Sequence, residues 1–430
     1  MNTRPEQIQI GVVADDVTGA NDIAVMYVKG GLSANVFSFD SRESALSHEA
    51  DVVVIDTDSR FMPARTAYQR VFEATRTLAD AGIKRFFKKT CSVFRGNIGA
   101  EFDGMLDALG EKFAVVVLGF PDNGRTTVDG VHYVRGTLLE ESEFRNDPVN
   151  PMTESNLADI LRRQTRRGVK AVGWPVIEEG PEALRAEIER QKKEGGYLIL
   201  DVRDNKDLEI IAEATEHIRV MCGASAIAYP QAKRCQSSRK SRLMPPALKP
   251  GLGIMSVSGS LMPQTREQII CAGEQGTLSC ALPVRELFED RETLVERLSS
   301  LAAEGVSSGR DVLVYSDNDR QIVEEGKQFA ASLGFDEKQM AKCISETLAQ
   351  ICRNVLERTG QNRVLVAGGD TSGSFCSEMK IDGMAVYEEI ESGLPSSIAL
   401  TEPPLFIVLK SGSFGGREFF VKTYRYLREN

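Results

Sequence analysis

The front half of the chain contains short polar turns in which carboxylates and basic side chains occur close together. Carboxylates bind the hydroxyl groups of sugars, and one of them could remove a hydroxyl proton. Arginine offers a planar pair of donors that matches a carboxylate. A pocket built from such side chains would suit a small polyhydroxy acid, and the candidate residues are Asp16, Arg60, Lys89, Ser92, Arg95 and Asn97.

Each of these residues also has an ordinary structural interpretation. Asp15 or Asp16 could simply cap the helix that follows, as aspartate does at many helix N-termini. Arg60 and Arg95 could be solvated loop residues, which is the commoner state of a single arginine. Cys91 is expected to be a packed thiol rather than a nucleophile, because no histidine lies near it in the sequence.

The back half repeats one kind of turn three times. The turns follow apolar runs and read Ser258-Gly259-Ser260, Gly368-Gly369-Asp370-Thr371-Ser372-Gly373 and Lys410-Ser411-Gly412-Ser413-Phe414-Gly415-Gly416. Glycine permits positive φ and close approach of the backbone, so that successive N–H groups can converge on an anion. A helix that begins directly after such a turn adds its partial positive charge. Lys410 could pair with a phosphate oxygen, and Asp370 could help to hold a metal ion or cap a helix.

One such turn is usually no more than a tight connection between a strand and a helix. Three of them, each expected at the carboxyl end of a strand, favour a nucleotide site, because open α/β sheets bind ligands at that edge. The chain contains no G-x-x-x-x-G-K-[ST] motif, and no G-x-G-x-x-G motif follows a strand. We therefore expect the phosphates to be held without a P-loop or a dinucleotide-binding fold.

Short β-branched runs alternate with amphipathic segments, which predicts parallel sheets covered by helices on both faces. The expected strands cover residues 9–14, 51–56, 85–89, 114–119, 169–173, 197–202 and 219–222 in the first half, and 253–257, 278–283, 311–315, 363–367 and 405–409 in the second. Helices are expected after Pro263 and over residues 64–81, 154–167, 181–194, 206–216, 292–303 and 337–359.

Residues 231–251 are basic, rich in Ser and Pro and without an apolar period, which is typical of a linker between domains. A chain of 430 residues is also too long for one ordinary core. We therefore expect two different α/β domains, residues 1–230 and 252–430, each with a mostly parallel sheet flanked by helices. The active site is expected in the cleft between them.

Composition narrows the range of partners. The formal charge of −10 argues against a nucleic acid or an anionic membrane. The eight cysteines occur without a C-x-x-C pair and the three histidines lie apart, so free thiols are expected and no metal ligands are assigned. The opening MNTRPEQIQI lacks the apolar core of a signal peptide, and no apolar run reaches about 18 residues. A soluble, cytoplasmic protein is expected, and a homodimer is compatible with the sequence.

Seven segments together resemble the four-carbon acid sugar kinase family, whose members include 3-oxo-tetronate, D-threonate and erythronate kinases. They read VVADDVTGAND, DTDSR, KKTCSVFRGN, GFPDNGRTTVDG, SVSGS, VAGGDTSG and LKSGSFGG, in this order along the chain. Each segment is short, but together they cover nearly the whole chain from Asp15 to Gly416.

The resemblance implies an ATP-dependent kinase, assisted by Mg²⁺, that phosphorylates a hydroxyl of a four-carbon sugar acid such as threonate, erythronate or 3-oxo-tetronate. The terminal hydroxyl is the implied acceptor. An N-terminal domain would bind the acid through Asp15, Asp16, Arg60 and the Lys89–Asn97 loop, which includes Gly96. A C-terminal domain would bind ATP through Ser258, the Gly368–Ser372 turn and Gly412. Many members have Asp where this chain has Cys91, which leaves Asp16 as the candidate catalytic base.

Two other functions remain open on the sequence alone. The run VVVIDTDSR imitates the strand and D-x-D motif of haloacid-dehalogenase-like phosphatases. In that group the later acidic motif should follow the D-x-D, whereas here the Asp15-Asp16 pair precedes it. A non-catalytic sensor of a sugar acid or nucleotide could have the same folded domains. Two different polar sites favour an enzyme, because each could hold one of two reactants that must be brought together.

Overall fold

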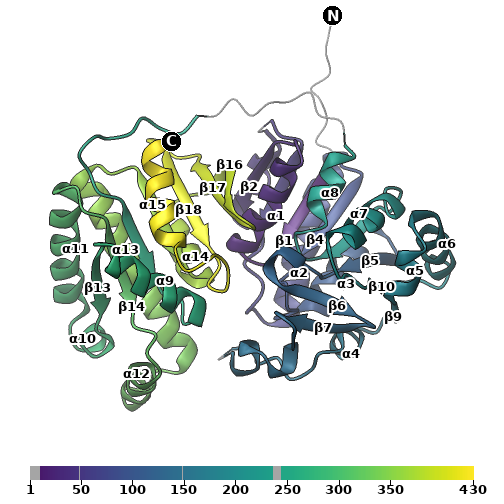
Figure 1. Ribbon diagram of the computed structural model, residues 1–430, viewed down its shortest axis with the longest axis horizontal. Coiled ribbons are helices and arrows are strands. Elements are labelled where there is room, and N and C mark those ends of the chain that lie inside the picture. Colours follow the sequence, from purple (N-terminus) through teal and green to yellow (C-terminus); the bar gives the residue numbers. More distant parts are fainter. Residues whose placement is uncertain (1–9, 48, 148, 236–243) are drawn as a thin grey trace, which may run out of the picture. The chain divides into compact units, whose positions relative to one another are not determined.

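The computed structural model describes residues 10–47, 49–147, 149–235 and 244–430, and the chain divides into two compact units, Met1–Ser241 and Arg242–Asn430 (Figure 1). Of the segment predicted as a linker, residues 236–243 lie outside the described residues, as does position 9 of the first predicted strand. Residues 231–233 form the last turn of helix α8 (Ala228–Lys233), where the buried Gln231 accepts a hydrogen bond from Tyr27.

The sheet of the first unit is parallel between all its neighbouring strands, in the order β2-β3-β1-β4-β11-β5-β10-β9. Its strands β1, β5 and β10 are apolar and buried on both faces, as is typical of a parallel sheet. The strands are β1 (Ile10–Ala14), β2 (Ala34–Ser38), β3 (Val52–Asp56), β4 (Arg85–Lys89), β5 (Phe113–Val117), β9 (Val169–Val172), β10 (Gly196–Leu200) and β11 (Val220–Gly223). The predicted strands are confirmed, and β2 was not predicted.

Two groups of helices pack on this sheet (Figure 1). In one group α2 packs against α3 and α3 against α4, and in the other α1 packs against α8, α8 against α7 and α7 against α6. Their bounds are α1 (Val17–Lys29), α2 (Ala64–Asp80), α3 (Ile98–Leu109), α4 (Leu157–Arg162), α5 (Trp174–Glu178), α6 (Pro181–Lys192) and α7 (Asn205–Ala214).

A small antiparallel ribbon that the sequence did not predict is inserted after β5. It consists of β6 (Arg125–Val128), β7 (Val131–Val134) and β8 (Thr137–Leu138). Asp201, just beyond the end of β10, fixes the ribbon's first turn by accepting hydrogen bonds from the N–H groups of Asp129 (2.6 Å) and Gly130 (2.9 Å). A buried carboxylate thus ties the ribbon to the carboxyl edge of the sheet.

The sheet of the second unit runs β13-β14-β12-β15-β18-β17-β16. The pairs from β13 to β18 are parallel, whereas β17 pairs antiparallel with both β18 and β16. The strands are β12 (Met255–Ser258), β13 (Leu278–Leu282), β14 (Val312–Ser316), β15 (Arg363–Ala367), β16 (Gly383–Glu391), β17 (Leu394–Ala399) and β18 (Leu405–Lys410). The mostly parallel sheet was predicted, and the β16–β17 hairpin was not.

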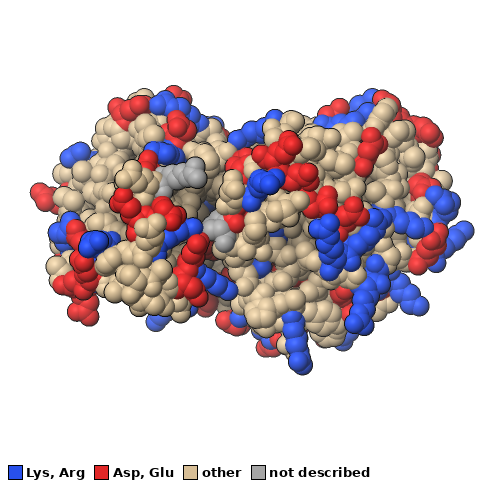
Figure 2. Space-filling view, turned by 90° about the horizontal axis from the view of Figure 1, so that it is seen from below, with Lys and Arg blue, Asp and Glu red and all other residues tan. Residues whose placement is uncertain are grey.

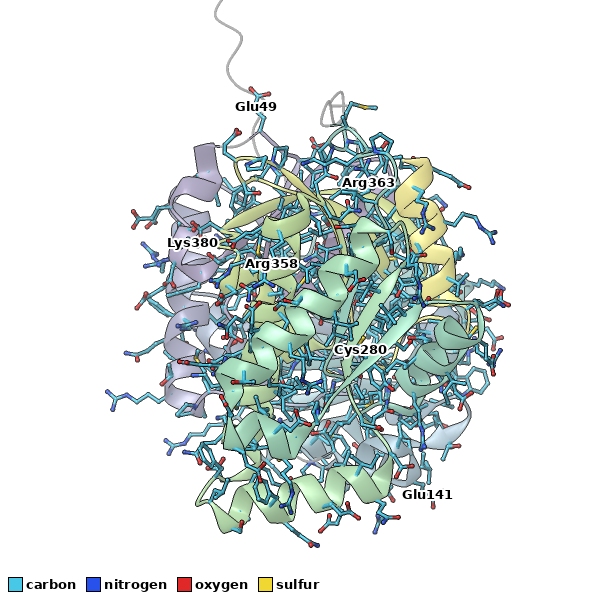
Figure 3. The ribbon with its side chains drawn as sticks, turned by 90° about the vertical axis from the view of Figure 1, so that its left-hand side faces the viewer. Glu49, Glu141, Cys280, Arg358, Arg363 and Lys380 are labelled. Atoms are coloured by element: carbon cyan, nitrogen blue, oxygen red, sulfur yellow. The ribbon has the colours of Figure 1, made fainter. Side chains whose placement is uncertain are left out.

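Helices flank this second sheet as well (Figure 1). The long helix α13 packs against α11 and α14, while α9 packs against α15. The bounds are α9 (Pro263–Glu274), α10 (Val284–Glu289), α11 (Arg291–Ser307), α12 (Arg320–Ser332), α13 (Glu337–Thr359), α14 (Gly369–Glu378) and α15 (Phe419–Glu429). The fully buried Arg363 donates to the carbonyl oxygens of Leu427 (2.7 Å) and Pro246 (2.9 Å), beside α15 (Figure 3). It therefore anchors the end of the predicted linker to the second sheet.

The distribution of surface charges and the state of the cysteines agree with what the composition predicts. Acidic and basic side chains lie among one another on the face drawn in Figure 2. All eight cysteines are free thiols, as predicted, including Cys280 on β13 (Figure 3). Among the described residues, no helix combines the length and apolar character needed to span a bilayer.

Candidate functional site

In the first unit, the turns after β1 and β3 meet through Arg60. Its Nε and Nη2 donate to the two carboxylate oxygens of Asp15, at 2.7 Å and 3.0 Å, and its Nη1 donates to Asp16 Oδ2 at 2.5 Å. Asp15 is 1% exposed and Arg60 9% exposed. The two strands are parallel neighbours with Ala14 opposite Asp56, which places the two turns side by side. Arg60 is thus part of a buried ion-pair network rather than a solvated loop residue.

Asp16 also caps helix α1. Its Oδ1 accepts from the Gly19 N–H at 2.7 Å and its Oδ2 from Thr18 Oγ1 at 3.0 Å. The absence of a side chain at Gly19 makes room for the charged groups, because a Cβ there would lie 2.6 Å from Asp16 Oδ1 and 3.2 Å from Lys89 Nζ. Lys89 itself pairs with Asp22 at 3.4 Å. The structure therefore brings Asp15, Asp16 and Lys89 together over the first turn of α1.

Cys91 lies beside Arg95. Arg95 Nε donates to Cys91 Sγ at 3.3 Å, and Arg95 Nη1 pairs with Asp147 at 2.5 Å. Burial by itself would raise the pKa of the Cys91 thiol, but the positive charges of Arg95 and Arg60 outweigh burial and lower it. The surroundings of Cys91 therefore favour a negative charge on its side chain.

The loop after β4 is held by a buried histidine of β7. His132 Nε2 lies 3.0 Å from the carbonyl oxygen of Ser92, and its Nδ1 lies 3.0 Å from Thr127 Oγ1. A carbonyl oxygen can only accept, so Nε2 carries the proton and Nδ1 accepts from the threonine. Burial lowers the pKa of His132 to about 3, which keeps the ring neutral near pH 7.

Gly96 and Asn97 position the loop that carries Arg60. Asn97 Nδ2 donates to the carbonyl oxygens of Ser59 (3.1 Å), Arg60 (3.3 Å) and Met62 (2.7 Å). Gly96 has φ +101°, and a Cβ there would lie 2.8 Å from Arg60 Cγ. Both residues were predicted to bind substrate, and the structure places them in contact with the backbone around Arg60.

A second buried network lies next to these groups. Lys88, which is 0% exposed, pairs with Glu101 Oε2 at 2.9 Å, and Ser59 Oγ donates to Glu101 Oε1 at 2.6 Å. A buried ion pair persists only where further hydrogen bonds satisfy its atoms, and Ser59 supplies one of them. Glu101 therefore links the end of β4 to the turn that carries Arg60.

Acid unfolding should reveal the Asp15–Arg60 pair. Burial would raise the pKa of Asp15, but Arg60, with Lys88 and Lys89, outweighs burial and lowers it from 3.8 to about 2. The unfolded chain then binds a proton at higher pH than the folded protein, so this contribution to stability is complete above pH 4 and is lost as the pH falls towards 2. We expect about 2 kcal/mol of unfolding free energy to be lost over that interval.

The measurement is urea unfolding of the protein and of its Asp15→Asn variant between pH 5 and pH 2. The variant should show a shallower pH dependence in this window, because the titrating carboxyl is absent. Equal slopes for the two proteins would mean that Asp15 does not hold its charge through Arg60.

In the second unit, the three glycine-containing turns converge. They follow β12, β15 and β18, which are parallel neighbours in that order. A Cβ at Gly259 would overlap Thr371 Oγ1, and a Cβ at Gly412 would overlap Ser260 Oγ. Gly368 has φ +113°, and a Cβ there would lie 3.4 Å from the Ser260 nitrogen. All three predicted turns therefore lie within contact distance of one another.

Unpartnered hydroxyls and a helix N-terminus lie at the same place. Helix α14 begins at Gly369, and its N-cap residue Gly368 provides no side-chain hydrogen bond. Ser258 Oγ and Ser372 Oγ are buried and have no hydrogen-bond partner among the described residues. A helix N-terminus with free donors attracts an anion, and buried hydroxyls without partners are rare in native proteins. The arrangement suits a phosphate group.

Lys410 differs from the expectation for it, and Asp370 does not cap its helix. Lys410 is 0% exposed, and its ammonium donates to Thr265 Oγ1 (3.0 Å) and to the carbonyl oxygens of Ser411 (2.9 Å) and Gly412 (3.1 Å). Asp370 is exposed in the first turn of α14 and is not its N-cap residue. Among the described residues, no group of three or more His, Cys, Asp or Glu side chains is placed to hold a metal ion.

Sequence reasoning missed four residues of these sites. Glu101, His132 and Asp147 position the first site, and Gln268 of α9 contacts the loop after β18. Each contacts a partner far away in the sequence, so no local motif contains both. The signal in the sequence was only that each of these polar residues stands in an apolar or ribbon-forming segment. Such a signal does not say which distant residue it contacts.

Comparisons with known proteins agree with this division of roles. A family described as a sugar-binding N-terminal domain matches residues 10–230, and a family described as a nucleotide-binding C-terminal domain matches residues 255–420. The chain is 32% identical over 429 residues to a 3-oxo-tetronate kinase of Pseudomonas fluorescens, covering 98% of this chain and 97% of the relative. It is also 32% identical over 427 residues to a 3-oxo-tetronate kinase of Burkholderia multivorans, covering 97% of each.

Solved structures share the fold along the whole chain. A protein from Salmonella typhimurium LT2, provisionally named a tRNA synthase, has a TM-score of 0.81 at 28% identity and covers 98% of this chain and 100% of its own. A Haemophilus influenzae protein has a TM-score of 0.71 at 28% identity, with 97% and 100% coverage. With both domain families matched and full-length relatives above 30% identity, the chain belongs to the four-carbon acid sugar kinase family.

Proposed function

We propose that this protein transfers the γ-phosphoryl group of ATP to a hydroxyl of a four-carbon sugar acid, with 3-oxo-tetronate as the first candidate. Residues 1–230 bind the acid, residues 252–430 bind the nucleotide, and residues 231–251 link them. The terminal hydroxyl is the proposed acceptor, because it is the least hindered hydroxyl and lies farthest from the carboxylate.

The convergence of three glycine-containing turns around Ser258 and Ser372 is the observation that carries the proposal. Backbone N–H groups of the turns could donate to phosphate oxygens, as could the Ser258 and Ser372 hydroxyls, which have no partner among the described residues, and glycine leaves the backbone accessible. Several full-length relatives are named 3-oxo-tetronate kinases. We assign Ser258, Gly259, Ser260, the Gly368–Ser372 turn, Gly412 and Gly415 to the nucleotide.

On the acid side, Asp16 is the proposed base. Its carboxylate has about four lone-pair positions, and hydrogen bonds from Thr18, Gly19 and Arg60 occupy three of them. One position remains for a substrate hydroxyl, which Asp16 would orient and deprotonate. Arg95 and Lys89 supply positive charge for the carboxylate of the acid, with Cys91 and Ser92 beside them.

Mg²⁺ enters as part of the nucleotide substrate in this proposal. Mg²⁺ commonly keeps several water molecules and binds through one or two carboxylates together with phosphate oxygens, so a protein cluster of three ligands is not needed. The exposed Asp370 at the start of α14 is the carboxylate that would meet it. The metal would neutralise charge on the transferred phosphoryl group.

The matched families favour a kinase over the two other functions. One family is described as nucleotide-binding, and a phosphatase of the haloacid-dehalogenase type would leave the phosphate-binding turns of the second unit without a role. A sensor would need no second site for a co-reactant. The measurement of phosphate release from generic phosphomonoesters without ATP distinguishes a phosphatase from a kinase.

A coupled ADP-release assay over a panel of four-carbon acids tests the proposal. We expect ATP-dependent turnover with at least one of 3-oxo-tetronate, D-threonate, L-threonate and erythronate, and only background ADP release without an acid. Turnover should be absent when the ATP is replaced by a non-hydrolysable analogue. ATP binding in a thermal-shift experiment without turnover on any acid of the panel would contradict the proposed reaction.

We also propose a cytoplasmic location and a homodimer. Cell fractionation measures the first, and light scattering on the purified chain measures the second.

A further inference from the structure

The loop that follows β18 turns its carbonyl groups towards the protein interior. Lys410, the last residue of β18, donates from its buried ammonium to the carbonyl oxygens of Ser411 (2.9 Å) and Gly412 (3.1 Å). Its third hydrogen bond goes to Thr265 Oγ1 at 3.0 Å. All three N–H bonds of the ammonium therefore end on protein atoms, and none remains for a phosphate oxygen.

Helix α9, labelled in Figure 1, holds the same loop through four more side-chain contacts. Thr265 Oγ1 accepts from Lys410 and donates to the carbonyl oxygen of Gly412 at 2.8 Å. Gln268 Nε2 lies 3.1 Å from the carbonyl oxygen of Phe414 and 3.0 Å from those of Gly415 and Gly416. Thr265 and Gln268 are both 0% exposed, so these contacts are closed to water.

The direction of the carbonyl groups fixes the direction of the N–H groups. In a planar trans peptide, the C=O of one residue and the N–H of the next point in opposite directions. The carbonyls of Ser411, Gly412 and Phe414 face Lys410 and α9, so the N–H groups of Gly412, Ser413 and Gly415 are directed to the opposite side. A Cβ at Gly412 would overlap Ser260 Oγ, so the loop also contacts the turn after β12.

The contacts of this loop depend on the residue types at Gly415 and Lys410. Gly415 has φ +86°, and a Cβ there would lie 3.1 Å from Gln268 Nε2 and 3.0 Å from Phe419 Cγ. A buried lysine is unfavourable unless its charge meets acceptors. Burial lowers the pKa of Lys410 to about 7, and the nearby Glu391 carboxylate offsets only part of this effect. In this buried place Lys410 nevertheless meets three acceptors, two of which are carbonyl groups of the loop.

We infer that Lys410, Thr265 and Gln268 are positioning residues that hold the loop after β18 so that the N–H groups of Gly412 and Gly415 face the phosphates of the nucleotide. Lys410 acts through the loop and does not contact the phosphates. The inference rests on the proposed function for the identity of the ligand, whereas the geometry of the loop stands independently of it.

Thr265→Val tests the inference, because valine has the same shape and lacks the hydroxyl. Thr265→Ser restores the hydroxyl, and Thr423→Val is the matched control, since Thr423 Oγ1 is buried in the same unit without a hydrogen-bond partner among the described residues. We expect Thr265→Val to raise the KM for ATP about tenfold, the equivalent of one to two hydrogen bonds, with the KM for the acid unchanged. Thr265→Ser and Thr423→Val should retain the KM of the unaltered protein.

Hydrogen exchange on the nucleotide-free protein separates this inference from the proposed function. Amides of residues 411–416 should exchange faster in Thr265→Val than in Thr423→Val, whatever the protein phosphorylates. Faster exchange in a protein without kinase activity would refute the function and keep the loop geometry. Unchanged exchange and an unchanged KM for ATP in Thr265→Val would overturn the inference.

Lys410→Met provides a second variant that should fold, because it replaces a buried charge by an apolar side chain of similar length. We expect it to unfold at the same temperature or higher while its KM for ATP rises about tenfold or more. Lys342→Met, at a position 75% exposed on α13, is the control. A fall in thermal stability without a change in the KM for ATP would show a purely structural lysine and would contradict the inference.

Discussion

Replacing Arg60 by methionine should reduce kcat/KM for the sugar acid by about a thousandfold or more while ATP binding is retained. The guanidinium is the shared partner of Asp15 and Asp16, so its loss leaves two neighbouring carboxylates without a counter-charge. Breaking a buried pair in this way typically costs about 3–5 kcal/mol of stability as well. Steady-state kinetics with each substrate varied, together with urea unfolding, measure both effects.

Two companion variants make this result specific. Arg163→Met removes an arginine that is 65% exposed in the same unit and should change neither quantity. Adding Asp15→Asn to Arg60→Met removes the uncompensated charge and should recover part of the lost stability but not the activity. An equal loss of ATP affinity in Arg60→Met would mean that Arg60 does not belong to a separate acid-binding site.

Replacing Gly368 by valine should raise the KM for ATP at least about a hundredfold and leave the binding of the acid intact. Gly368 has φ +113°, which a β-branched residue does not adopt without strain. Its side chain would also enter the space between Thr371 Oγ1, 3.1 Å from the Cβ, and the Ser260 nitrogen, 3.4 Å from it. The phosphates would lose the N-terminus of α14.

A second glycine of the same unit separates backbone strain from blockage. Gly334 has φ +87°, and nothing lies within 4 Å of a Cβ built there. Gly334→Val therefore imposes similar strain outside the proposed site, and the KM for ATP should stay unchanged. Isothermal titration with ATP provides the comparison, and similar affinities for the two valine variants would remove Gly368 from the nucleotide site.

The regular elements could be predicted because their periodicity is local. Helix α13 and strand β15 have the predicted bounds, Glu337–Thr359 and Arg363–Ala367, since the apolar spacing and the residues that end them lie within the elements themselves. Strand β2 was missed because Ala34–Ser38 includes Asn35 and a terminal serine and is short. The β16–β17 hairpin was missed because glutamates and Pro395 obscure its alternation.

Strand order and side-chain direction could not be predicted, and the details of the sites depend on both. Asp15 and Arg60 are adjacent because β1 pairs with β3, a choice made by the packing of the whole sheet. Lys410 was expected to face a phosphate because it opens a glycine-containing turn after a strand. Its side chain turns instead to Thr265, a contact between residues on two elements that the sequence does not connect.

The position of β11 has a consequence for the synthesis of this protein. β11 is the last strand of the first unit along the chain, yet it lies between β4 and β5 in the middle of the sheet. A nascent chain therefore leaves the ribosome with β4 and β5 as two open edges until Val220–Gly223 emerges to join them. Contacts this distant in the sequence form slowly, so the growing polypeptide depends on late closure and is exposed to aggregation until the unit is nearly complete.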